Sequence, residues 1–389
     1  MRTGPAMLAV LALAMMATGA AAKPHSFIVI GDDGSPTEAV AVSADGSVVV
    51  GSYHTPDGQR AFLWTQSGGR VPLDQPTDLA WSWATDVSAS GDYVSGYGGS
   101  SFGTRDGWEG IRWQVGGDFD RIAVPGSAVW AAGISGDGLT IAGTVQGVPA
   151  ADLAEAFRWT PSGGVQNLGT LYDDLSWHQS NARGISNDGA TIIGDSQGSD
   201  GTNFYADGYR WTEADNMTGL GGAFSANAVS RDGQVVVGAI NTNEGFRAYR
   251  WTQADGFDPL GTLGPNQTSA ALGVSGDGRR VVGYVEDQGT DLRTAFVWDE
   301  GKGMRLLQDV LVNEFGFGNE LDGWTLTKVY AVSDDGSTLV GRGYYQPDPE
   351  QSGQDLAFRA VFPEPATLSF LALGGLLALR GRWRQGAAQ

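Results

Sequence analysis

The stretch Ala226-Asn227-Ala228-Val229-Ser230-Arg231-Asp232-Gly233-Gln234-Val235-Val236-Val237-Gly238 holds the pattern that decides the fold. In general form it reads small-x-small-Val/Ile-Ser-x-Asp-Gly-x-x-apolar-x-Gly. Seven copies occur, and their serines are Ser43, Ser88, Ser135, Ser186, Ser230, Ser275 and Ser333. Successive serines are 45, 47, 51, 44, 45 and 58 residues apart. Repetition at this period predicts a repeat architecture, and it outweighs any domain count taken from the length of 389 residues.

Each copy is expected to form a β-hairpin. An Asp-Gly pair between a small/apolar run and a Val-rich run is the strongest short-range signal of such a hairpin. Gly takes the positive φ of the turn, and Asp can accept a hydrogen bond from the backbone two residues on. These turns are predicted at Asp45-Gly46, Asp137-Gly138, Asp188-Gly189, Asp232-Gly233, Asp277-Gly278 and Asp335-Gly336. The second copy has Ser90-Gly91 instead, which favours a structural role for the aspartates over catalysis or metal binding.

A second marker follows each hairpin, an apolar-x-Trp strand. Its tryptophans are Trp64, Trp113, Trp159, Trp211, Trp251 and Trp298, and the seventh copy has Ala360 instead. We expect these rings to pack between repeats, and the arginines that often precede them to reach the neighbouring repeat. A Gly-rich turn and a fourth short strand complete the unit. Four strands in about 45 residues is the content of one β-propeller blade.

The two ends of the repeat region complement each other. Phe27 to Ile30 reads as a fourth strand with no repeat before it, while the seventh unit stops after its third strand, Phe358 to Phe362. Pairing them would close the ring and remove two exposed sheet edges. The sequence therefore predicts an all-β, closed seven-bladed propeller of four-stranded blades over residues 23–362. The wide gap before Ser333 adds one short helix, at Leu306 to Val312.

Composition excludes several functions. The formal net charge is −20, which disfavours binding to nucleic acid or anionic lipid. Cysteine is absent, so disulfides and thiolate metal sites are ruled out. His25, His54 and His178 lack metal-site spacing, and neither a His-Glu-x-x-His nor a P-loop pattern occurs. No cofactor is expected, although scattered carboxylates could bind Ca²⁺ weakly. Catalysis by a pair of carboxylates leaves no sequence spacing, so an enzyme stays open.

The termini carry targeting patterns. Residues 1–22 read as a signal peptide, with Arg2, an apolar stretch and an Ala-rich cleavage site. Residues 363–389 begin with Pro363-Glu364-Pro365 and continue with 14 apolar residues and an arginine cluster. Because a bilayer span needs about 20 apolar residues, this tail favours a processed sorting signal, with a retained anchor as the alternative.

The Ser-x-Asp-Gly hairpins and Ala-Phe-x-Trp strands resemble the bacterial extracellular HAF repeat family, although the His of that signature is missing. The tail, with Pro363-Glu364-Pro365, the apolar run and the arginines, is similar to a PEP-CTERM sorting signal. The resemblance implies export in a Gram-negative bacterium and an exosortase-type sorting enzyme as partner. It also implies transient insertion of the tail in the membrane and a location at the cell surface or in an exopolysaccharide matrix. The resemblance implies no catalytic residue.

The predicted topology gives the disc two unlike faces. The turns after the first and third strands lie on one face, here named the turn face, and are short. The loops after the second strand and the crossings between blades lie on the other, the loop face, and are long and rich in aromatic residues. The candidate ligand-binding residues lie there, just before inner strands: Trp81, Trp83, Trp130, Trp177 and His178.

Exposed aromatic rings on variable loops suit sugar stacking or protein docking. The alternative interpretation is that these rings only pack against their neighbours at the channel mouth. The sequence therefore favours non-catalytic recognition of exopolysaccharide or of a surface protein. Two alternatives stay open, a polysaccharide-acting hydrolase or lyase of propeller fold and a structural matrix protein without a specific ligand.

Overall fold

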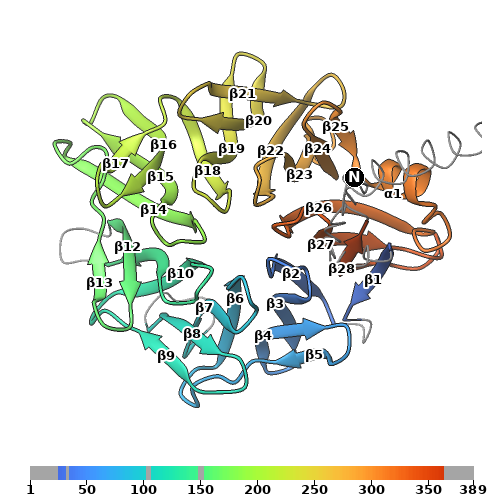
Figure 1. The fold of residues 1–389 in the computed structure, drawn as a ribbon, viewed down its shortest axis with the longest axis horizontal. Helices are drawn as coiled ribbons and strands as arrows, with labels where there is room; N and C mark the ends of the chain where they lie inside the picture. Colours follow the sequence, from blue (N-terminus) through green and yellow to red (C-terminus); the bar gives the residue numbers. More distant parts are fainter. Residues whose placement is uncertain (1–24, 32–34, 102–106, 148–152, 363–389) are drawn as a thin grey trace, which may run out of the picture.

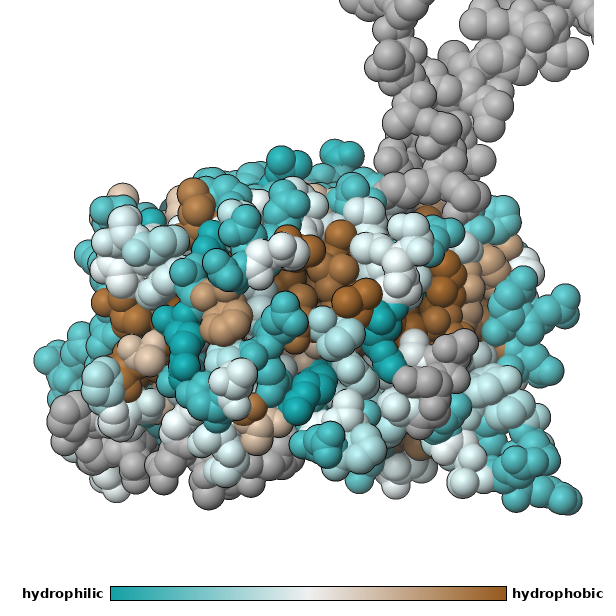
Figure 2. Space-filling model, turned by 90° about the horizontal axis from the view of Figure 1, so that it is seen from below, coloured by the Kyte–Doolittle hydropathy of each residue, from teal (hydrophilic) through white to brown (hydrophobic). Residues whose placement is uncertain are grey.

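Seven four-stranded antiparallel sheets surround a central axis in the computed structural model, which describes residues 25–31, 35–101, 107–147 and 153–362 (Figure 1). The predicted all-β, seven-bladed propeller is confirmed. Each sheet runs from an innermost strand at the axis to an outermost strand at the rim. Seen from the side, the disc carries hydrophobic residues in separate patches among hydrophilic ones (Figure 2).

The strands repeat in the same order from blade to blade. The innermost strands are β2 (Thr37–Val42), β6 (Trp81–Val87), β10 (Ala128–Ile134), β14 (Trp177–Ile185), β18 (Ala223–Val229), β22 (Gln267–Val274) and β26 (Trp324–Val332). The second strands are β3 (Val48–Thr55), β7 (Tyr93–Gly99), β11 (Ile141–Gln146), β15 (Ile192–Ser199), β19 (Val235–Thr242), β23 (Arg280–Asp287) and β27 (Thr338–Tyr345). The third strands are β4 (Gly58–Thr65), β8 (Glu109–Gln114), β12 (Ala154–Thr160), β16 (Phe204–Thr212), β20 (Gly245–Thr252), β24 (Arg293–Asp299) and β28 (Gln354–Val361). The outermost strands are β5 (Gly69–Pro72), β9 (Phe119–Ile122), β13 (Gly164–Asn167), β17 (Asn216–Gly219), β21 (Gly256–Gly261), β25 (Gly303–Leu306) and β1 (Ser26–Ile30).

Blade seven is completed by the N-terminal strand, as the sequence predicts. β1 pairs antiparallel with β28, with Ser26 opposite Val361 and Ile30 opposite Ala357. The ring of Phe27 stacks on Phe358 with centroids 5.6 Å apart. The blade therefore joins the two ends of the chain, and the ring has no open edge between its first and last units.

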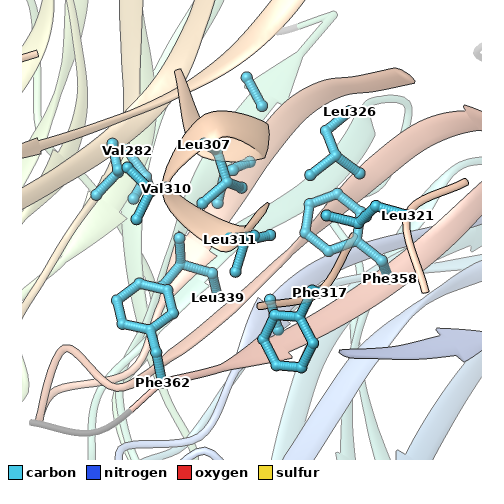
Figure 3. Close-up of a cluster of buried hydrophobic side chains, with 14 of the residues drawn as sticks. Val282, Leu307, Val310, Leu311, Phe317, Leu321, Leu326, Leu339, Phe358 and Phe362 are labelled. Carbon is cyan, nitrogen blue, oxygen red and sulfur yellow. The ribbon is translucent and has the colours of Figure 1, made fainter. Parts of the chain in front are cut away.

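The predicted helix is present and slightly longer than expected, as α1 (Leu307–Phe315). It ends where Gly316 takes a left-handed conformation with φ 79°, a common way to stop a helix. Figure 3 shows its apolar side chains beside Leu339 and Phe362 of blade seven. The insertion thus extends the hydrophobic core of the closing blade.

The Ser-x-Asp-Gly turns are built alike, and the fifth copy illustrates them. Ser230 Oγ donates a hydrogen bond to Asp232 Oδ1 at 2.7 Å, and the backbone N–H of Gln234 donates to the same oxygen at 3.0 Å. The N–H of Val235 donates to Ser230 Oγ at 2.9 Å. Gly233 has φ 72°, in the left-handed region that favours glycine. The side chains of Ser230 and Asp232 thus satisfy the turn's own backbone, which is a structural role.

Arginines of the third strand join neighbouring blades. Arg112 Nε donates to the carbonyl oxygen of Gly138 at 2.5 Å, and Arg250 Nε donates to that of Gly278 at 2.9 Å. Arg359 of blade seven reaches Gly46 of blade one at 2.8 Å. The predicted contact with the next blade is confirmed at these positions. Four of the six marker rings, Trp64, Trp113, Trp159 and Trp211, are buried, and Trp251 and Trp298 are partly buried against the hydrophobic core.

Three predictions concern residues that the structure does not describe. The signal peptide (1–22), the motif Pro363-Glu364-Pro365 and the remainder of the tail lie outside the described residues. Within the described ranges, no helix has both the length and the apolar character needed to cross a membrane.

We expect residues 363–389 to contribute nothing to stability, because this tail reads as a sorting signal, whereas Phe362 belongs to the core of blade seven. That side chain is 2% exposed, stacks on Phe315 at 5.1 Å, and lies under the Arg280 guanidinium at 4.5 Å. Deletion of 363–389 should leave the melting temperature unchanged. Phe362→Ala should lower the free energy of unfolding by roughly 3–5 kcal/mol. Thermal unfolding of both variants tests this, and a deletion that melts well below the full chain would contradict it.

Candidate ligand site at the channel mouth

Every innermost strand carries a β-bulge, and the bulge turns one extra residue toward the central channel. The register skips a residue at the same place in each pairing with the second strand, for example between Ala182 and Gly184, and β18 and β26 each skip one more, Phe224 and Thr327. The residues skipped at the shared place are Val40, Thr85, Ala132, Arg183, Asn227, Leu272 and Tyr330, and all of them line a cavity of about 510 Å³. We call this set the bulge ring. Since bulges re-aim side chains, the bulge ring sets the chemistry of the channel.

The channel is narrowed at the turn face. In six of the seven repeat turns, the residue after the serine donates a hydrogen bond from its N–H to the carbonyl oxygen of the corresponding residue in the next blade. Six such bonds of 2.8–3.1 Å join Ala44 to Ala89, Ala89 to Gly136, Gly136 to Asn187, Asn187 to Arg231, Gly276 to Asp334, and Asp334 to Ala44. The side chains of Asn187 and Asp334 also meet, with Nδ2 donating to Oδ2 at 3.1 Å from blades on opposite sides of the ring. A ligand would therefore enter from the loop face.

An aspartate carboxyl group lies inside the channel. Asp86 lines the deeper cavity near the turn face, where the other copies have Ala or Gly. Burial raises the pKa of Asp86 to about 6, against the hydrogen bonds that it accepts from the N–H groups of Ile134 and Val87, and nearby Asp334 raises it further. Nothing in the repeat pattern marks this residue except its departure from the pattern. Its observed role is to join blade two to blade three.

The predicted tryptophans of blades two and three do not share one environment. Trp81 is 3% exposed, with its ring 5.1 Å from that of Trp108 and 5.7 Å from that of Tyr97. It therefore offers almost no surface to a ligand. Trp83 is partly buried. Trp130 is partly buried too, but it lines the cavity of the bulge ring.

Trp177 and His178 belong to blade four, further around the ring. Trp177 is 36% exposed, and its ring lies 6.3 Å from that of Phe204. His178 Nδ1 lies 3.1 Å from the carbonyl oxygen of Leu175, so the imidazole is held by its own loop. All four tryptophans lie in the strands β6, β10 and β14, whereas the sequence pattern placed them just before these strands.

Exposed aromatic side chains gather on the loop face of blades four and five. We name this set the loop-face patch, and its members are Trp177, Phe204, Tyr205, Phe224 and Phe246. They lie at the loop-face ends of β14, β16, β18 and β20, and the rings of Phe224 and Phe246 are 4.8 Å apart. Sequence reasoning missed Phe246, because it follows a short loop that shows no unusual length.

A polar cluster in blade four lies between the patch and the channel. Asp195 is 2% exposed, and its Oδ2 accepts a hydrogen bond from Asn181 Nδ2 at 3.1 Å. Its Oδ1 pairs with Nε of Arg183, whose side chain remains 47% exposed. The buried carboxylate thus fixes two side chains that line the cavity of the bulge ring.

The channel cavity continues outward to Phe224 and Phe246, the two members of the patch in blade five. A second cavity, of about 590 Å³, is lined by Phe224 and Phe246 and shares Arg183, Asn227 and Leu272 with the first. Together they form one groove, from Trp130 past Arg183 to Phe224. We call this the mouth groove.

No metal site emerges from the described residues, since they contain no group of three or more His, Cys, Asp or Glu side chains able to hold a metal ion. Weak Ca²⁺ binding stays a prediction.

No known protein family and no curated protein matches this chain. Several solved structures do match it in fold. An oligogalacturonate lyase from Vibrio parahaemolyticus is 10% identical, with a TM-score of 0.56 over 88% of this chain and 98% of its own. The β-propeller domain of the Trilobed protease from Pyrococcus furiosus is 11% identical, with a TM-score of 0.56 over 85% and 99%.

An oligogalacturonate lyase in complex with manganese is 13% identical, with a TM-score of 0.53 over 88% of this chain and 98% of its own. The likeness is one of fold alone. The Pyrococcus domain has an open velcro topology, whereas β1 closes blade seven here.

Proposed function

We propose that the protein is an exported propeller that recognises exopolysaccharide, without catalysis, at the cell surface or in the surrounding matrix. The observation that carries the proposal is the loop-face patch of five exposed aromatic side chains. Aromatic rings stack on the apolar faces of sugars, and an exposed cluster of them on a soluble domain marks an interaction surface. The short turns of the opposite face carry no comparable aromatic cluster among the described residues.

The targeting patterns support the location. The signal peptide at residues 1–22 and the tail at 363–389 fit export followed by handover to an exosortase-type enzyme. The chain's net charge of −20 suits solubility outside the cell. Both patterns agree with a matrix ligand rather than with an intracellular one.

Removal of exposed rings from the patch should weaken sugar binding while stability stays unchanged. Trp177 and Phe224 are 36% and 47% exposed, so Trp177→Ala and Phe224→Ala leave no cavity in the core. Loss of one stacked ring should weaken binding about tenfold, which corresponds to about 1.4 kcal/mol. The ligand is first selected on a glycan array, with and without Ca²⁺, and affinities are then measured by calorimetry.

Leu139→Ala is the matched control, because Leu139 is 48% exposed and follows a turn on the opposite face. Equal loss of affinity in this control would contradict the proposal. Release of shortened or unsaturated product from a bound glycan would favour the hydrolase or lyase. Capture of a surface protein in place of any glycan would favour recognition of a protein. Absence of any binding would favour the structural matrix role.

A further inference from the structure

Blade four departs from the repeat at two positions that face each other. Asp195 follows the glycine of the second strand, where the other blades have Ser52, Tyr97, Thr144, Ala239, Tyr284 and Arg342. Arg183 holds the bulge-ring position, where the other blades have Val40, Thr85, Ala132, Asn227, Leu272 and Tyr330. Six blades fold without this acid-base pair, so the fold does not require it.

Burial of the carboxylate of this pair also costs free energy. A carboxylate removed from water destabilises a protein unless hydrogen bonds and an opposite charge compensate it. Asp195 has both, from Asn181 and from Nε of Arg183. This arrangement uses one edge of the guanidinium and leaves its exposed part facing the cavity, with the orientation of the side chain fixed. Such a preorganised guanidinium suits an oxyanion, which it can bind through two parallel hydrogen bonds.

The charge of the groove supports an anionic ligand. Arg183 is the one charged residue among the described residues that line the cavity of the bulge ring, in a chain whose net charge is −20. Lys328 adds a second cation at the rim, with Nζ 5.7 Å from the ring centre of Tyr330, which lines that cavity. Burial, together with Arg293 and Arg342, lowers the pKa of Lys328. Glu38 and Glu286 lie close enough to Lys328 to counteract this lowering, so Arg183 is the residue that supports an anionic ligand.

The two arms of the groove differ in character. Toward blade three, Trp130 offers a ring with no carboxylate beside it among the described lining residues. Toward blade five, the groove passes Phe224 and Phe246 and ends near Glu286 and Asp291. Glu286 pairs with Nε of Arg293 at 2.8 Å, and Arg183 is the one cationic side chain among the described residues that line this second cavity, so the anionic group belongs at Arg183.

We propose that the mouth groove binds an acidic oligosaccharide, with the carboxylate or sulfate of one sugar on Arg183 and neighbouring sugars against Trp130 and Phe224. This rests on the proposed function and narrows it from polysaccharide in general to an acidic one.

The test uses three hexasaccharides that differ only at the sixth carbon, measured on the purified full chain by calorimetry. Cellohexaose is neutral, its C6-oxidised form carries carboxylates, and its C6-sulfated form carries sulfates. We expect at least one acidic form to bind roughly tenfold or more tightly than cellohexaose, a difference of about 1.4 kcal/mol. The two acidic arms decide between carboxylate and sulfate.

Three variants locate the effect. Arg183→Gln should lower the affinity for the acidic form to the affinity for the neutral form. Arg183→Lys keeps the charge but not the planar guanidinium, so its affinity for the acidic form should be intermediate. Arg279→Gln is the matched control, because it removes the same charge from a side chain that is 70% exposed beside a turn on the opposite face. Melting temperatures accompany each measurement, and the comparison of ligands on the unmodified protein does not depend on any variant folding.

The outcomes separate the two proposals. Equal affinity of the unmodified protein for neutral and acidic forms overturns the acidic ligand and leaves sugar recognition standing. An equal effect of Arg183→Gln and Arg279→Gln also overturns it, since general attraction would then explain the preference. Absence of binding to every saccharide, here and on the glycan array, overturns the proposed function as well.

Discussion

A chain that lacks residues 24–31 is expected to melt about 10 °C or more below the intact protein. The deletion removes β1, which carries the fully buried side chain of Ile30 and the ring of Phe27 packed against Phe358. Loss of one large buried apolar side chain costs roughly 1.5–3 kcal/mol, and several are lost together. The deletion also exposes the edge of β28, which then keeps only β27 as its partner. Thermal unfolding followed by circular dichroism measures the effect.

A synthetic peptide of residues 24–31 provides the control. Added to the shortened chain, it should pair with β28 as an extra strand and raise the melting temperature in a concentration-dependent way. A peptide of the same composition in scrambled order should have no effect. If the shortened chain melted like the intact one, β1 would not close the ring in solution.

Gly233→Val should destabilise the propeller far more than Asp232→Ser. Gly233 has φ 72°, where a β-branched residue is strained by roughly 1–3 kcal/mol. Its added Cβ would also lie 2.5 Å from Oγ1 of Thr191 in blade four, and such overpacking costs about 1–3 kcal/mol more. The strain and the clash together predict a loss of about 2–6 kcal/mol.

Asp232→Ser should cost about 1 kcal/mol or less, because a serine can take over part of the turn. Blade two shows how, since the N–H of Asp92 donates to Ser90 Oγ at 3.4 Å and that of Tyr93 still reaches Ser88 Oγ at 3.0 Å. Denaturant unfolding of both variants compares the two losses. Equal losses would mean that the glycine has no special conformational role.

The repeat made the fold predictable, because each copy restates the same hairpin. The closure by Phe27 to Ile30 followed from counting strands at the two ends. Packing of Gly233 against the preceding blade could not be read from the sequence, since it depends on how far blades are rotated about the axis.

The site was predicted only in outline. The loop face was recognised by loop length and aromatic content, but burial of Trp81 depends on Trp108, which lies just before β8. Arg183 and Asp195 were missed for a different reason. The pattern leaves the bulge position variable, and a strand without a bulge would not turn Arg183 to the channel in this way. A comparison of aligned copies, position by position, would have shown both residues as departures.

The closure of blade seven also fixes how the disc would be presented on a tether. Ser26 and Val361 are paired, and Val361 lies opposite Thr338, just after the turn at Asp335-Gly336. Both ends of the described chain thus leave from the turn face, at one point of the circumference. The mouth groove opens on the reverse side, and blade four lies across the ring from blade seven (Figure 1). Attachment through either end would hold the mouth groove on the side away from the support. A polymer could then reach the groove without entering the space between the disc and the support.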